Sequence, residues 1–303
     1  MTKSLIRKIV IAVLTVIIVF AVFSAVAMIY IFPQLKALFS RSERPQYSEY
    51  IPYDEYKITY PREEFTLLSG KNNIQCYRYG VGNTGGLVII SPGIGEGADS
   101  MLAEMMRFVN AGYQVVSFDP TGVFNSEGDS QIGLTQEYLD LDAVLTWVEE
   151  QEEYEDFSIY LYGFSSGGYA SATALGSDHY ITAAVAVSAF DNPLDIIDEW
   201  TRGSLGILAG KLARPYIALY NFVKFGTKSN ISATDAINSC DTPILIFHGS
   251  NDGVVSYSSS SIISHQSEFT NPNARAITCS NIGQNDHATI FLSRGAVEQR
   301  IKK

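Results

Sequence analysis

Apolar residues in this 303-residue chain follow a regular alternation from Glu64 onward. Short runs rich in β-branched and aromatic residues are separated by longer stretches with helical periodicity. The predicted strands are FTLLS, IQCYRYG, LVIISPG, QVVSFD, FSIYLYG, ITAAVAVSAF, TPILIFHG and ARAITCS. The predicted helices are SMLAEMMRFVNAG, LTQEYLDLDAVLTWVEEQ and a segment from Ser166 to about Leu175. Continuously apolar strands separated by helices predict an α/β fold, with a mostly parallel eight-stranded sheet covered by helices on both faces.

The alternation is interrupted late in the chain. Residues 193–239 contain two or three amphipathic helical stretches, LDIIDEW and LARPYIALYNFVKF among them, and no clear strand. The sheet then resumes with TPILIFHG. We therefore predict a helical insertion here. In an open α/β sheet, functional residues gather at the carboxyl ends of the strands, so the candidate chemistry is sought there.

A second apolar pattern lies near the N-terminus. Residues 9–32 carry no charged side chain, and a helix needs about 20 apolar residues to cross a membrane. Lys3, Arg7 and Lys8 fall on the short tail 1–8, and such a positive tail favours the cytoplasmic side. These features predict a single-pass signal anchor in the cell membrane, with the remaining chain on the extracytoplasmic side.

Cleavage of this segment is the alternative. The tripeptide Ala-Val-Ala ending at Ala27 fits a signal-peptide cleavage site and would give a secreted protein. We favour an uncleaved anchor because the apolar run continues to Phe32. Residues 33–61, rich in Tyr, Pro, Ser and charge, are predicted to link the anchor to one globular domain at 62–303.

Composition narrows the classes of partner. The net charge of −11, with no Lys/Arg cluster beyond the first residues, gives no electrostatic footprint for nucleic acid. The three cysteines show no metal-ligand spacing, so we predict no metal site and no disulfide framework. The glycine-rich stretch SPGIGEGADS is not followed by Gly-Lys-Ser/Thr and therefore is no phosphate-binding loop. We expect no cofactor.

The stretch YLYGFSSGGYA places a Gly-x-Ser-x-Gly pentapeptide at the end of a predicted strand. A serine in a sharp strand-to-helix turn adopts a strained backbone, and the residues two before and two after it must be tiny. Gly163 and Gly167 occupy those positions, which makes Ser165 the candidate nucleophile. The backbone N–H of Ser166, at the predicted helix N-terminus, is a candidate oxyanion donor. The alternative is an ordinary serine between glycines.

A serine hydroxyl needs a base, and the chain has four histidines. His287 follows the last predicted strand through a short polar loop and opens a predicted final helix, so we predict it as the base. Asp252 lies just past the preceding strand and is the predicted acid, in the chain order serine, acid, histidine. Asp191 is the alternative acid. We expect His248 to brace its turn.

The second oxyanion donor is expected in the loop after the third strand, ISPGIGEGADS. Gly93, Gly95 and Gly97 leave its backbone N–H groups open to a bound carbonyl oxygen, and we predict Ile94 as the donor.

These motifs resemble the α/β hydrolase superfamily, and within it the serine aminopeptidase-like and Bem46-like esterase group. The resemblance covers about residues 64–297. It rests on YLYGFSSGGYA, on FHGSNDGVV as a match to His-Gly-x-x-Asp-x-x-Val, on Asp-His at His287, and on SFDPTGVFNSEG. In SFDPTGVFNSEG, Phe124 stands where the family usually has glycine. In SPGIG, a Ser-Pro pair stands where many relatives have histidine.

The resemblance implies hydrolysis through an acyl-enzyme. Ser165 would attack a carbonyl, His287 would transfer the proton, and water would release the acyl group. The resemblance fixes neither the acyl group nor the leaving group. Our leading hypothesis for the substrate is an ester, thioester or small amide, with carboxylesterase activity ahead of peptidase activity, and the insertion at 193–239 would form the cap that selects it. An acyltransferase with the same triad and a non-catalytic binding module both stay open as alternatives.

Overall fold

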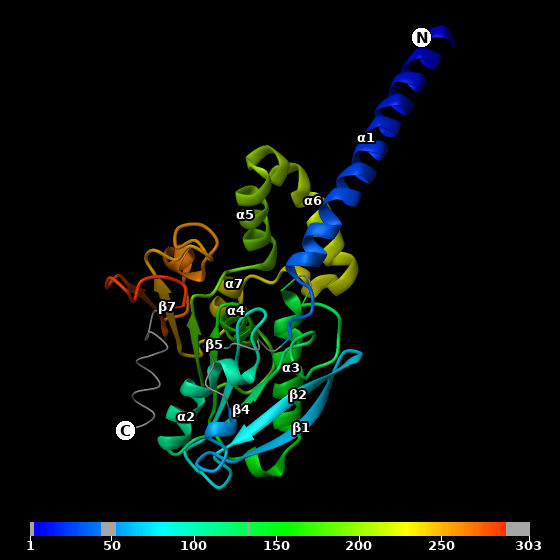
Figure 1. Cartoon of the computed structure of the whole chain (residues 1–303). Helices are drawn as coiled ribbons and strands as arrows, with labels where there is room; N and C mark the ends of the chain where they lie inside the picture. Colours follow the sequence, from blue (N-terminus) through cyan, green and yellow to red (C-terminus); the bar gives the residue numbers. More distant parts are fainter. Residues whose placement is uncertain (1–2, 44–52, 132–133, 289–303) are drawn as a thin grey trace.

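The computed structural model describes residues 3–43, 53–131 and 134–288 (Figure 1). Its eight strands form one sheet in the order β1-β2-β4-β3-β5-β6-β7-β8. The pairs β1–β2 and β2–β4 are antiparallel, and all other neighbours are parallel, so the predicted mostly parallel eight-stranded sheet is confirmed. The strands are β1 (Arg62–Ser69), β2 (Asn72–Tyr79), β3 (Leu87–Ser91), β4 (Gln114–Phe118), β5 (Ile159–Phe164), β6 (Ala183–Val187), β7 (Ile244–Gly249) and β8 (Ala274–Cys279).

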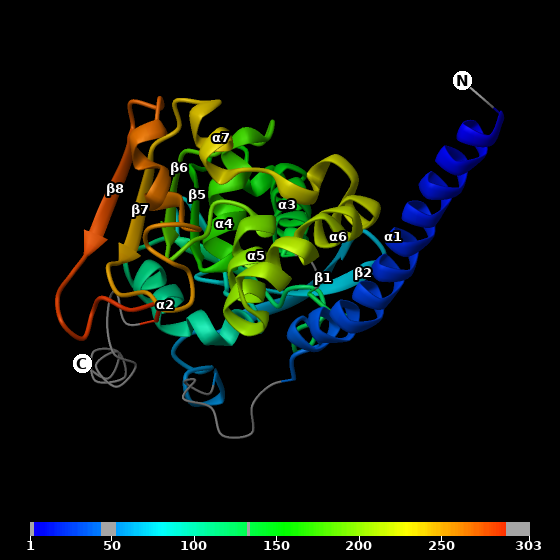
Figure 2. The ribbon, with the colours of Figure 1, turned by 90° about the horizontal axis from the view of Figure 1, so that it is seen from above.

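Helices cover both faces of this sheet (Figure 2). The helices of the described chain are α1 (Lys3–Leu38), α2 (Leu102–Asn110), α3 (Thr135–Glu149), α4 (Ser166–Thr173), α5 (Pro193–Leu205), α6 (Ile207–Phe225) and α7 (Ala233–Asn238). The three predicted core helices are therefore present, and the predicted insertion at 193–239 is helical. The final helix predicted after His287 lies outside the described residues.

The sheet divides the core into two layers because successive side chains of a strand point to opposite faces. In β3, Leu87 and Ile89 pack in the cluster that contains α3 and α4. Their neighbours Val88 and Ile90 pack in the cluster that contains α2. The central strand is buried on both faces, which explains why its sequence is continuously apolar rather than alternating.

Helix α1 is the one helix of the described chain that is long and apolar enough to cross a membrane, and no residue in the most apolar part of its span Lys3–Tyr30 is buried. It is longer than the predicted 9–32 segment and runs into the predicted linker, as far as Leu38. Phe39 is buried immediately after it. Arg41 then donates to the backbone carbonyls of Phe124 and Ser126, at 2.5 and 2.7 Å. The end of α1 is thus fixed on the domain surface.

Candidate active site

Ser165 lies between β5 and α4 with φ +54° and ψ −116°. Residues other than glycine rarely adopt a positive φ, and such strain persists only where the surrounding structure enforces it. A Cβ on Gly163 would overlap the backbone of Gly167, and one on Gly167 would overlap the carbonyl of Ser91. The turn is therefore closed by the two glycines, as the pentapeptide predicted.

The structure brings Ser165, His287 and Asp252 together from three separate segments. The Nε2 atom of His287 lies 3.0 Å from the Oγ atom of Ser165, and its Nδ1 atom lies 2.7 Å from Oδ2 of Asp252. An Nδ1–H that donates to the carboxylate leaves Nε2 free to accept the serine proton. The 3.0 Å distance is within the range over which the serine proton could pass to His287, and the 2.7 Å distance is that of a charge-assisted hydrogen bond.

The carboxylate of Asp252 is buried and fully engaged. Its Oδ1 accepts the backbone N–H groups of Val254 and Val255, each at 2.9 Å. Its Oδ2 faces His287 and also lies 3.3 Å from Nε2 of His248. Burial by itself raises the pKa of Asp252, but the hydrogen bonds from His248, His287 and Val255 outweigh it and hold that pKa well below its usual range. The group is thus kept ionised, as an orienting acid requires.

His248 is completely buried, and its Nε2 donates to the carbonyl of Val255 at 3.0 Å. It therefore braces the turn after β7, as expected. The contact between His248 and Asp252 was not predicted. The sequence shows that the two residues are four positions apart, but it does not show that the turn brings their side chains together.

The loop that carries His287 is held from several sides. Ser188, which follows β6 with φ +53°, donates its hydroxyl to the carbonyl of His287 at 2.9 Å. The N–H of Asn251 donates to the carbonyl of Asn285 at 2.8 Å, and the ring of Phe164 lies 5.2 Å from the imidazole, centroid to centroid. Sequence reasoning missed Ser188, since one serine after a strand carries no distinguishing signal.

The alternative acid, Asp191, has different contacts. It accepts the N–H of Thr234 at 2.8 Å and the hydroxyl of Ser232 at 3.3 Å, both at the start of α7. Its role is therefore to hold the N-terminus of that helix, where a carboxylate is favoured.

The two predicted oxyanion donors lie on neighbouring elements. Ser166 is the first residue of α4. Ile94 lies in the loop after β3, whose last residue, Ser91, is paired with Gly163 of β5. The N–H of Gly95 is already used, because it donates to Oε1 of Gln131 at 2.7 Å. The donor roles of Ser166 and Ile94 stay predictions.

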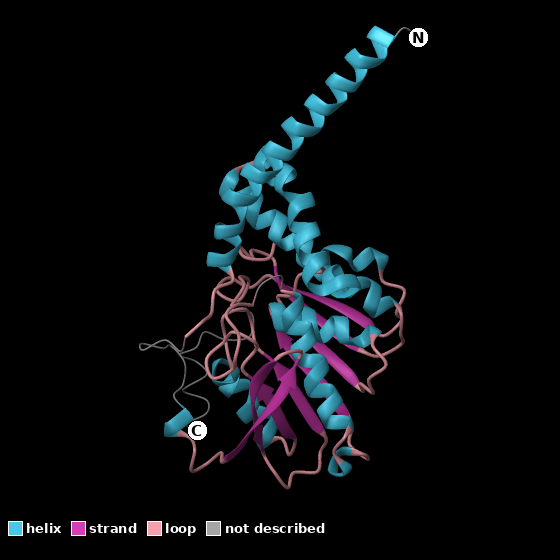
Figure 3. Ribbon diagram, turned by 90° about the vertical axis from the view of Figure 1, so that its right-hand side faces the viewer, coloured by secondary structure: helices cyan, strands magenta, loops and turns pink. Residues whose placement is uncertain are grey.

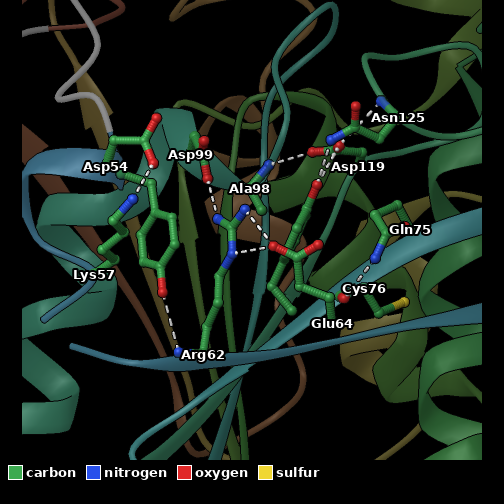
Figure 4. A network of polar contacts seen from close by, with 12 residues as sticks. Asp54, Lys57, Arg62, Glu64, Gln75, Cys76, Ala98, Asp99, Asp119 and Asn125 are labelled. Carbon is green, nitrogen blue, oxygen red and sulfur yellow. Dashed lines mark hydrogen bonds and ion pairs between the residues drawn. The ribbon is translucent and has the colours of Figure 1, made fainter.

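A buried polar network supports the loop that follows Ile94 (Figure 4). Asp119 accepts the N–H of Ala98 at 3.0 Å and the hydroxyl of Tyr77 at 2.9 Å. Burial outweighs these hydrogen bonds and raises the pKa of Asp119. Arg62 reaches the same loop from β1 and pairs with Asp99 at 2.8 Å. The end of β2, the start of β1 and this loop are thus tied together.

The turn SFDPTGVFNSEG has a structural role in this chain. Ser126 donates its hydroxyl to the carbonyl of Asp119 at 2.5 Å and accepts the N–H of Gln75 at 2.8 Å. Phe124, at the position where the family usually has glycine, adopts φ +41°. The backbone therefore keeps the conformation that favours glycine, with a phenylalanine in its place. In the part of the chain that the structure describes, no cluster of three or more potential ligands could hold a metal ion.

Residues 47–206, more than half of the chain, match the family model described as X-Pro dipeptidyl-peptidase (S15 family). The matched segment includes Ser165 and ends before Asp252 and His287. A curated protein, the polyketide transferase grgF of Penicillium sp, is 29% identical over 135 residues. That match covers 43% of this chain and 46% of the relative, so the chain spans less than half the length of the relative it matches.

Solved structures give a longer match. The Pyrococcus furiosus esterase Pf2001 superposes with a TM-score of 0.61 at 17% identity, over 86% of this chain and 95% of the esterase. The α/β hydrolase GrgF from Penicillium sp. sh18 superposes with a TM-score of 0.52 at 17% identity, over 80% of this chain and 96% of its own. At such identities the likeness shows a shared fold.

Proposed function

This chain belongs to the X-Pro dipeptidyl-peptidase (S15) family and has the α/β hydrolase fold, and from that membership we propose that it is a serine hydrolase acting through an acyl-enzyme on Ser165. The substrate class we propose is an ester, a thioester or a small amide. The observation that carries the proposal is the hydrogen-bonded series from Ser165 through His287 to Asp252, built on a strained serine turn.

In the proposed acylation step, Oγ of Ser165 forms a bond to the substrate carbonyl carbon while its proton passes to Nε2 of His287. Asp252 stabilises the imidazolium that results. The negative charge on the carbonyl oxygen would be met by the backbone N–H groups of Ser166 and Ile94. Collapse of this intermediate breaks the bond to the leaving group, which takes the proton from His287.

Deacylation repeats the same steps with water. His287 removes a proton from water, the hydroxide attacks the acyl carbon, and Oγ of Ser165 leaves with the proton returned by His287. The similarity to a polyketide transferase supports one second candidate, in which another acceptor replaces water. Product analysis with an added alcohol or thiol distinguishes the two, because an acyltransferase yields the acylated acceptor in preference to the free acid.

A fluorophosphonate probe tests the proposed nucleophile. We expect one covalent adduct per chain, located by peptide mass spectrometry on Ser165, because the probe phosphonylates a serine whose proton is removed by a neighbouring base. Heat-denatured protein is the control and should not react. An unlabelled native protein, or an adduct on another residue, would overturn the proposal.

We further propose that α1 anchors the protein in the cell membrane and that the domain lies on the extracytoplasmic side. The charge-free run of α1 and the three basic residues before it support this arrangement. Protease added to intact cells should then digest the domain, while a cytoplasmic marker protein stays intact. A protected domain contradicts the orientation, and a mature N-terminus just after Ala27 contradicts the anchor.

A further inference from the structure

The cap helix α6 has a buried side and, opposite to it, an exposed apolar side. Its buried side consists of Gly210, Ala213, Ile217 and Asn221, and Ala213 and Ile217 belong to the main hydrophobic core. Its outer side carries five apolar side chains that are between 46% and 77% exposed: Leu208, Leu212, Leu219, Phe222 and Val223. At 3.6 residues per turn these five form one stripe about 100° wide. The side of a helix that faces water normally carries polar residues. The outer side of α6 is apolar instead, which is typical of a surface that contacts a membrane or another protein.

The helix lies directly against α1 (Figures 1 and 3). The hydroxyl of Tyr216 on α6 lies 2.6 Å from that of Ser24 on α1. Ser24 stands eight residues before Phe32, the end of the predicted apolar segment. At about 1.5 Å per residue, the contact lies roughly 12 Å inside that segment. One leaflet of the hydrocarbon core is roughly 15 Å thick, so a spanning α1 places this part of α6 at the depth of a leaflet.

The charges of α6 fit the same position. The helix contains Lys211, Arg214 and Lys224 and no acidic residue. Arg214 is paired with Asp195 and Asp198 of α5, and both lysines are exposed. Helices that lie in a membrane interface combine an apolar face with lysines whose long side chains reach the headgroups.

We propose that the outer face of α6 lies in the hydrocarbon of the membrane leaflet next to the domain, so that the cap is a second membrane contact beside α1. The inference rests on the proposed anchoring by α1. It follows from the exposed apolar stripe, from the contact between α6 and α1 through Tyr216 and Ser24, and from the basic charge of the helix. Phe39 and Arg41 fix the end of α1 to the domain. The helix α1 and the outer face of α6 would therefore contact the bilayer at the same time.

The test uses the full chain in vesicles of phosphatidylcholine and phosphatidylglycerol. Cys76 is buried, and the partly exposed Cys240 and Cys279 are replaced by serine, which allows one environment-sensitive dye on an added cysteine. The dye is placed by Leu219→Cys on the stripe, by Val16→Cys on α1, or by Thr146→Cys on the exposed side of α3. A cooperative thermal unfolding transition like that of the wild type shows that each dye-labelled protein is folded.

We expect the dye at position 219 to emit at shorter wavelength than the dye at 146, and to lose most of its fluorescence to nitroxides on the lipid acyl chains, as the dye at 16 does. If the dye at position 219 behaves like the dye at position 146 while the dye at position 16 is quenched, this inference is overturned and the proposed anchoring by α1 still holds. Shorter-wavelength emission without quenching means that protein, such as a second copy, covers the stripe, and also overturns it. An unquenched dye at 16 overturns the anchor and the inference with it; none of these outcomes bears on the proposed hydrolase chemistry.

Discussion

The Ser165→Ala variant is expected to lose fluorophosphonate labelling completely and to lose about 10⁵-fold or more in kcat towards an activated aryl ester. The change removes the one atom that would form the acyl bond and leaves His287 and Asp252 in place. Alanine meets the same backbone strain as serine at φ +54°, so the fold should tolerate it. Initial rates and thermal unfolding measured on the same preparations check both expectations.

Ser171→Ala is the matched control for this variant. Ser171 lies on α4, the helix that Ser165 precedes, is buried like Ser165, and its hydroxyl has no hydrogen-bond partner among the residues that the structure describes. Removing that hydroxyl should change kcat by less than about twofold, since surrounding contacts stay intact. The assignment of the nucleophile is wrong if Ser165→Ala keeps its activity, or if both variants lose it equally.

Much of the fold could be predicted because local pattern and global packing agree. Strands such as LVIIS are buried on both faces, and this produces a continuous apolar run that is readable in the sequence. The serine turn was equally readable, because the close backbone approach at Gly163 and Gly167 leaves no room for a Cβ there, and Ser165 between them has a positive φ. In both cases the physical requirement falls on residues that are close in sequence.

Other features depend on segments that are distant in sequence. Ser188 reaches the carbonyl of His287 across 99 residues, and neither residue type predicts the contact. The end of α1 at Leu38, beyond the predicted 32, follows from the docking of Phe39 and Arg41 against a turn more than 80 residues later. Such contacts are set by tertiary geometry, which the periodicity of a single segment does not contain.

The second large effect is expected for Asp252→Asn, which should lower kcat by about 10⁴-fold with little change in structure. The asparagine amide would donate to Nδ1 of His287, so the imidazole would carry its hydrogen on Nε2 and could not accept the serine proton. Measuring kcat and KM separately checks this, because the loss should fall on kcat.

The effect of Asp252→Asn on folding stability should depend on pH, and the sign of this dependence follows from the lowered pKa of Asp252. A carboxylate whose pKa is lower in the folded than in the unfolded state stabilises the fold above its unfolded pKa, about 3.9, and loses that contribution as pH falls through its folded pKa. Asp252→Asn should therefore be less stable than the wild type at neutral pH, and the difference should shrink in acid. Thermal unfolding at a series of pH values measures it.

Asp191→Asn is the matched control, since it makes the same chemical change at the acid that contacts α7. An asparagine oxygen can still accept the N–H of Thr234, so this variant should keep kcat within about twofold and lose at most about 1 kcal/mol of stability. A larger loss of kcat in Asp191→Asn than in Asp252→Asn would transfer the role of acid to Asp191. A larger loss of kcat in Asp252→Asn would identify Asp252, just past the end of β7, as the carboxylate that orients His287.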